Sequence, residues 1–119
     1  MELSRHERIK KEQSRLTRIF KNIDGDKFKS VEGLIKRASF MRITLEDYES
    51  DINENGSVEL FSQSDKTEPY ERERPVVRLY NTMNKNYQSI MKQLTDMLPK
   101  DSLVEVNPIE EFKKAFKSD

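Results

Sequence analysis

The side chains with the clearest potential for chemistry lie around Gly56, where several residues with oxygen-bearing side chains occur close together. The first positions of a calcium-binding loop are matched there by Asp51, Asn53, Asn55, Gly56 and Ser57. The last position of such a loop must supply both oxygens of a carboxylate, and in this chain it is Ser62. The residues that follow Gly56 also favour a strand over the exiting helix of such a site. We therefore predict no metal site and interpret Gly56 as a helix stop.

Catalytic groups are scarce in the sequence. His6 is the only histidine and lies among basic residues, cysteine is absent, and the three glycines form no phosphate-binding loop. No nucleophilic triad, thiolate metal site or nucleotide-binding loop can be assembled from these residues. The sequence therefore predicts a protein that is not an enzyme and that needs no cofactor.

Cationic side chains are the remaining candidates for ligand binding. The net charge is zero, but residues 1–42 hold 12 Lys and Arg against 6 Asp and Glu, whereas residues 43–75 hold 3 against 10. This separation can steer an anionic polymer to one face, or let the basic end of one subunit meet the acidic middle of its neighbour. Alternatively, the basic residues only keep an exposed helix soluble. The candidate DNA-binding residues are Arg5, Arg8, Lys11, Arg15, Arg18 and Lys21.

The spacing of apolar residues predicts the helices that carry these side chains. Ile9, Leu16 and Ile23 recur every seven residues and predict a first helix over residues 5–23. Asp24 offers an N-cap for a second helix over residues 27–55. Its helix-period positions are Phe28, Val31, Leu34, Ile35, Ala38, Met41, Leu45, Tyr48 and Ile52.

A hairpin and a third helix are expected to follow. Residues 57–62 alternate as a strand, and a return strand near residues 67–72 is restricted to a sheet edge by Pro69. Pro75 suits the first turn of the third helix, which Pro99 ends. The apolar or large side chains of that helix are Val77, Tyr80, Asn84, Tyr87, Met91, Leu94 and Leu98.

The predicted fold is mainly α. Three principal helices form a helical core with a long helical hairpin, a short β-hairpin at about residues 57–72 joins the second and third helices, and a short helix ends the chain. The core domain covers residues 1–100 and the tail covers residues 101–119. Because only 34% of the residues are hydrophobic, either the bundle is modest or self-association supplies the missing burial.

Four residues are candidates for an oligomer interface. Phe40 and Ile43 fall off the main stripe of the second helix, and Tyr80 and Tyr87 lie one heptad apart on the third. Packing within one chain is the alternative for all four. No window approaches the length of an apolar membrane span, and the N-terminus lacks the apolar core of a signal peptide. We therefore expect a cytoplasmic protein without a membrane partner.

Two stretches carry a family resemblance. GLIKRASFMRITLEDYESDINENGSVELF and the pattern VxxYNxxxKxYxxxxKQLxxxLPK, which runs from Val77 to Lys100, resemble the small subunit of phage terminases. That subunit is the DNA-recognition component of the packaging motors of tailed phages. The resemblance implies a helix-rich core that ends in a helical hairpin, and subunits that assemble into rings. A separate helix-turn-helix domain cannot be placed in the first 23 residues, so DNA binding would rest mainly on phosphate contacts and multiplicity.

The resemblance implies a non-catalytic, oligomeric adaptor. Its partners would be phage double-stranded DNA, other copies of itself, and a large terminase subunit with ATPase and nuclease activities. The predicted tail helix offers a docking motif for the large subunit at Ile109, Phe112 and Phe116, although it could instead pack on its own domain. The alternative function is a helical structural or regulatory protein that binds only protein and has no affinity for nucleic acid.

Overall fold

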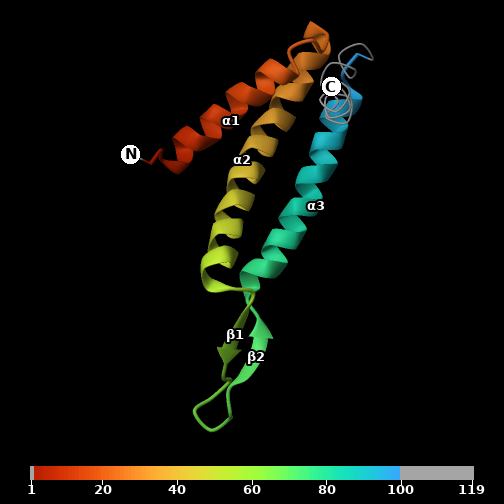
Figure 1. Cartoon of the computed structure of the whole chain (residues 1–119). Coiled ribbons are helices and arrows are strands. Elements are labelled where there is room, and N and C mark those ends of the chain that lie inside the picture. The colour runs from red at the N-terminus through yellow and green to blue at the C-terminus, as the bar shows by residue number, and fades with distance from the viewer. Residues whose placement is uncertain (1, 100–119) are drawn as a thin grey trace, which may run out of the picture.

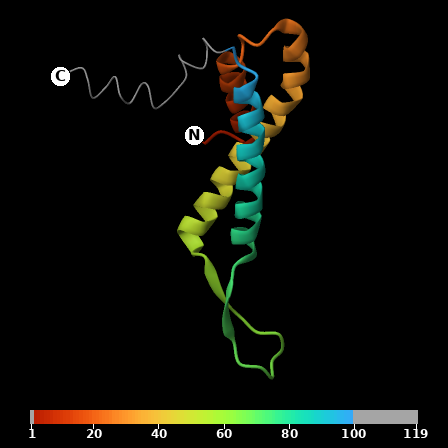
Figure 2. The same ribbon diagram turned by 90° about the vertical axis from the view of Figure 1, so that its right-hand side faces the viewer.

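The computed structural model describes residues 2–99, which form a long helical hairpin with the N-terminal helix packed along one part of it (Figure 1). The elements are α1 (Arg5–Ile19), α2 (Gly25–Asn55), β1 (Val58–Phe61), β2 (Tyr70–Glu73) and α3 (Pro75–Asp96). Helices α2 and α3 run side by side. The β-hairpin connects the end of α2 to the start of α3 and extends beyond that end of the helix pair (Figures 1 and 2). The predicted mainly α fold with a hairpin between the second and third helices is confirmed for this part of the chain.

Helix α1 is shorter than the sequence predicts. Ser4 is its N-cap and accepts a hydrogen bond from the backbone N–H of Glu7 at 3.1 Å. The helix ends at Ile19, so the prediction that it reaches residue 23 is wrong. The chain turns there, with a hydrogen bond from the Ile23 N–H to the Phe20 carbonyl at 3.2 Å. This turn places the apolar side chains of Phe20 and Ile23 in the core while the backbone reverses.

Helix α2 begins and ends close to its predicted limits. Asp24 is the N-cap residue, although its side chain makes no capping hydrogen bond and its backbone carbonyl instead accepts from the Phe28 N–H at 2.7 Å. At the other end, the Gly56 N–H donates to the Ile52 carbonyl at 2.7 Å, and Gly56 has a φ of 83°. The interpretation of Gly56 as a helix stop is confirmed.

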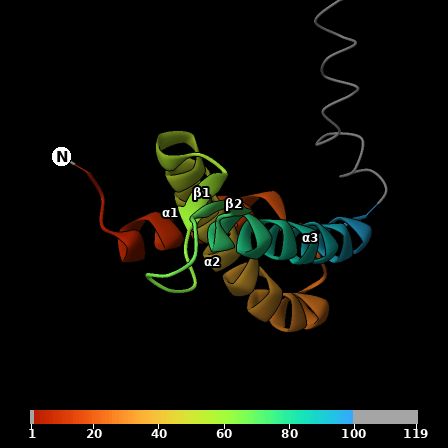
Figure 3. The ribbon, with the colours of Figure 1, turned by 90° about the horizontal axis from the view of Figure 1, so that it is seen from below.

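The hydrophobic core lies at one end of the molecule. Its buried residues come from α1 and the turn after it, from the first half of α2, and from the end of α3 and the turn that follows: Leu16, Phe20, Ile23, Val31, Ile35, Ala38, Leu94 and Leu98. All three helices meet in this region, whereas only α2 and α3 continue toward the β-hairpin (Figures 1 and 2; Figure 3 gives the view from the hairpin end). Helix α3 ends at Asp96, before Pro99, which the sequence predicts as its end. The predicted apolar seam is buried at Leu94 and at Leu98, just after the helix, but only half-buried at Val77 and Tyr80.

The β-hairpin is antiparallel, with Val58 opposite Glu73 and Phe61 opposite Tyr70. Its return strand starts later than predicted, because Pro69 comes just before β2 and cannot donate to the strand ladder. In the turn, the Ser62 hydroxyl donates to the carbonyl oxygens of Ser64 at 2.6 Å and Thr67 at 3.0 Å. Pro75 then begins α3 in its first turn, as the sequence predicts.

Two further predictions concern the tail and the membrane. The predicted C-terminal helix, with its candidate docking residues Ile109, Phe112 and Phe116, lies outside the described residues. Among the helices of residues 2–99, none has the length and apolar character needed to cross a membrane.

Candidate nucleic-acid interface

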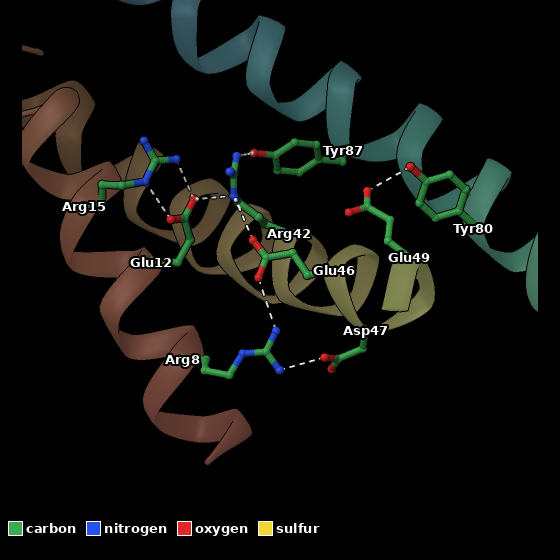
Figure 4. A network of polar contacts seen from close by, with 9 residues as sticks. All are labelled: Arg8, Glu12, Arg15, Arg42, Glu46, Asp47, Glu49, Tyr80 and Tyr87. Atoms are coloured by element: carbon green, nitrogen blue, oxygen red, sulfur yellow. Dashed lines mark hydrogen bonds and ion pairs between the residues drawn. The ribbon is translucent and has the colours of Figure 1, made fainter. Parts of the chain in front are cut away.

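Two of the six candidate DNA-binding residues are engaged by α2. Arg5 pairs with Asp47 and also donates to the Thr44 hydroxyl. Arg8 donates to Asp47 at 2.7 Å and to Glu46 at 3.2 Å (Figure 4). The hydrogen bond to Asp47 is the main cause of a raised pKa of Arg8. The first turns of α1 are thus held on α2 by charge, so these two guanidinium groups are already neutralised locally.

A third candidate, Arg15, is held within α1 itself. It donates from Nε and Nη2 to the two carboxylate oxygens of Glu12, both at 2.7 Å, and this bidentate contact raises the pKa of Arg15. Glu12 is only 8% exposed, which is unusual for a charged side chain. Its burial is compatible with a charge because Arg15 and, from α2, Arg42 both lie within ion-pair distance.

Arg42 connects all three helices. Its Nε lies 3.7 Å from Glu12 of α1 and 3.5 Å from Glu46 of α2, and its Nη1 donates to the hydroxyl of Tyr87 of α3 at 3.4 Å (Figure 4). The hydrogen bond to Tyr87 is the main cause of a raised pKa of Arg42. The i,i+4 spacing of Arg42 and Glu46 permits their pair on α2. Residue spacing does not reveal Glu12 as a third member, because its contact with Arg42 depends on where α1 crosses α2.

The other three candidates remain available to a ligand. Lys11, Arg18 and Lys21 are exposed, and none has an ion pair within the described part of the chain. Lys11 and Arg18 line an open depression of about 330 Å³ between α1 and α2. The charged residues that line it are four cations and two anions, namely Arg8, Lys11, Arg15, Arg18, Glu12 and Glu46. The depression therefore carries an excess of positive charge, supplied by its two unpaired cations.

The four candidate interface residues differ in accessibility. Phe40 is 49% exposed, with the Arg5 guanidinium 5.1 Å from the centre of its ring. Ile43 is only 5% exposed and borders the depression beside α1, so packing within one chain already covers it. Tyr80 and Tyr87 are half-buried, and their hydroxyls contact Glu49 and Arg42 of α2. Phe40 is thus the candidate that a second molecule can reach most easily.

The residues that resemble a calcium loop instead join α2 to α3. Asp51 and Asn55 belong to the end of α2, and the Asp51 carboxylate accepts from Asn55 at 2.6 Å and from Arg74 at 2.9 Å. These hydrogen bonds, that from Asn55 first, lower the pKa of Asp51. Arg74 also donates to the Gly56 carbonyl at 2.7 Å. In residues 2–99, no three His, Cys, Asp or Glu side chains are grouped so that they could hold a metal ion.

Comparisons of the chain with models of known families, with curated proteins and with solved structures found no match. Its function must therefore be inferred from the residues and from their arrangement in the fold.

Proposed function

We propose that this chain is a small terminase subunit, a non-catalytic oligomeric adaptor that binds phage DNA and delivers it to a large subunit for genome packaging. The resemblance of two stretches, residues 33–61 and 77–100, carries the proposal. Most of these residues belong to α2 and α3, the two helices that pair as the long hairpin. A non-enzymatic role agrees with the lack of an assembled catalytic or nucleotide-binding motif in the sequence.

The free cations of α1 and of the turn after it are the proposed phosphate contacts. A guanidinium that already pairs with a carboxylate must exchange one ion pair for another when it binds phosphate, so its net contribution is small. Arg5, Arg8 and Arg15 are in this position. We therefore assign the larger contribution to Lys11, Arg18 and Lys21, which give up no such partner and release counterions from the DNA.

A charge-removal series tests this assignment. The triple variant K11Q/R18Q/K21Q is expected to bind double-stranded DNA more weakly and to lower the slope of log affinity against log salt by about 0.9 for each phosphate that is no longer neutralised. Fluorescence anisotropy at several salt concentrations measures both quantities. The matched control is K66Q/R78Q/K85Q, which removes the same charge from the hairpin turn and from α3. Equal reductions in affinity in the two triple variants would show that net charge, and not α1, governs binding.

The proposed contact with the large subunit lies in residues 101–119, through Ile109, Phe112 and Phe116. Deletion of these residues should abolish pull-down of a large terminase subunit and leave the number of subunits in the assembled adaptor unchanged. Retained pull-down would remove the tail from the interaction.

The alternative, a helical protein that binds only protein, is favoured by one observation, the exposed apolar side chains of Phe40, Val58 and Leu60. The two functions differ in a single measurable property. The adaptor has a salt-dependent affinity for double-stranded DNA, whereas the alternative protein forms complexes with other proteins and has no such affinity.

A further inference from the structure

The two faces of the β-hairpin have different environments. Side chains alternate between the faces of a strand, so the pairs Glu59–Arg72 and Phe61–Tyr70 share one face. The side chains of this face contact one another. The Arg72 guanidinium lies 3.6 Å from the centre of the Phe61 ring and its Nε 2.6 Å from the Glu59 carboxylate, while the Phe61 and Tyr70 rings meet edge to face at 5.9 Å.

The opposite face has no such cover. It consists of Val58, Leu60, Glu71 and Glu73, which we call the hairpin face. Leu60 is 73% exposed and Val58 is 54% exposed. Glu71 and Glu73 are also exposed, and neither has an ion pair in residues 2–99. The hairpin extends beyond the end of α2 and α3 and away from α1, so the described helices leave this face open (Figures 1 and 2).

A surface of matching chemistry lies on α2 of the same chain. Lys36 and Arg37 precede Phe40 by four and three residues, so the three side chains are neighbours on the helix surface, and we call them the α2 patch. All three are exposed, and the two cations lack ion-pair partners among the described residues. The α2 patch therefore offers one large apolar side chain beside two cations, and the hairpin face offers two apolar side chains beside two carboxylates.

These two surfaces cannot meet within one chain. The helix from Phe40 to Asn55 is about 22 Å long at the usual helical rise, and the hairpin continues away from its end. A contact between them must therefore join two molecules.

We propose that the hairpin face of one copy docks on the α2 patch of the next copy. Burial of Leu60 and Val58 against Phe40 supplies apolar contact, and pairing of Glu71 and Glu73 with Lys36 and Arg37 sets the orientation. Because the two surfaces differ, each copy can dock on the next, which yields a closed ring or an open filament, whereas reciprocal docking of two copies would close a two-fold dimer. The inference rests on the self-association in the proposed function and adds the surfaces that make it.

Charge exchange tests the proposal. The mass of the full chain is measured by light scattering after size-exclusion chromatography, and circular dichroism checks the helix content of each variant. The wild-type chain should be a multimer, and E71K/E73K and K36E/R37E should each lose the multimer peak. The combined quadruple variant exchanges the charges across the interface and should recover it. The control E54K/D65K makes an equal charge change at other exposed carboxylates near the hairpin and should remain multimeric.

The remaining outcomes contradict the proposal in distinguishable ways. If both double variants keep the wild-type mass, or if the quadruple variant stays dissociated, these two surfaces do not pair, and self-association must use another face. If K36E/R37E lowers DNA affinity without changing the mass, the α2 patch is a DNA-binding surface instead. A wild-type chain that stays monomeric at every concentration overturns both this interface and the self-association assumed in the proposed function. A multimer that follows the charge exchange but binds no DNA upholds the interface and contradicts the adaptor.

Discussion

Arg42 lies 3.7 Å from Glu12, and this contact joins the middle of α2 to the buried carboxylate of α1. Glu12 also receives both hydrogen bonds of Arg15, so one carboxylate faces two guanidinium groups. Arg42 extends the contact to α3 through Tyr87. The three helices are thus joined by a polar network beside the apolar core, and this network includes Arg15, one of the candidate DNA-binding residues.

Removal of the Glu12 charge is expected to destabilise the fold. The Glu12→Gln variant leaves Arg15 and Arg42 close together without the carboxylate that neutralises them, which should cost about 1–3 kcal/mol of unfolding free energy. Urea denaturation followed by circular dichroism measures the change. Glu32→Gln, at an exposed position on α2, should stay within about 0.5 kcal/mol of wild type. Equal values for the two variants would show that Glu12 is not needed to balance the arginines.

Replacement of glycine by alanine should change the free energy of unfolding in opposite directions at two positions. Gly56 has a φ of 83° and a ψ of −178°, a conformation that is essentially restricted to glycine, so Gly56→Ala should cost about 1–3 kcal/mol. Gly33 lies inside α2, and a methyl group added there would meet nothing within 4 Å, so Gly33→Ala should gain about 0.5–1 kcal/mol. Thermal unfolding midpoints report both signs. A stabilising Gly56→Ala would mean that the backbone at this helix end differs from the one described.

The Asp51 contact should make part of the stability depend on pH. Hydrogen bonds from Asn55 and Arg74 lower the pKa of Asp51 in the folded protein. A carboxyl of this kind stabilises the fold above its unfolded pKa of about 3.9, and this stabilisation is lost as the pH falls through the folded pKa. Asp51→Asn should therefore melt below wild type at neutral pH, with a difference that shrinks in acid. The control is Glu54→Gln, at an exposed position near the same helix end. A difference in melting temperature that stays constant from neutral pH to strong acid, or that equals the difference for Glu54→Gln, would contradict the assignment.

The sequence predicts the helices well because their apolar residues recur at the helical period over many turns. Residue type identifies Gly56 as the end of α2 and Pro75 as the start of α3. It misses the end of α1, because Phe20 and Ile23 continue the apolar pattern in a turn that also faces the core. Whether a candidate DNA-binding residue forms an ion pair depends on the tertiary structure, which residue spacing does not show. Arg8 and Lys11 are similar in type and close in sequence, yet only Arg8 lies opposite carboxylates of α2.

The one-sided position of the core has a mechanical consequence. Where α1, α2 and α3 meet, buried apolar contacts resist bending and are insensitive to salt. Toward the β-hairpin only two helices remain, and polar contacts such as those of Tyr80 with Glu49 and of Arg74 with Asp51 join them. The end next to the β-hairpin therefore depends more on polar contacts, which added salt or strong acid weakens, than the end that holds the core.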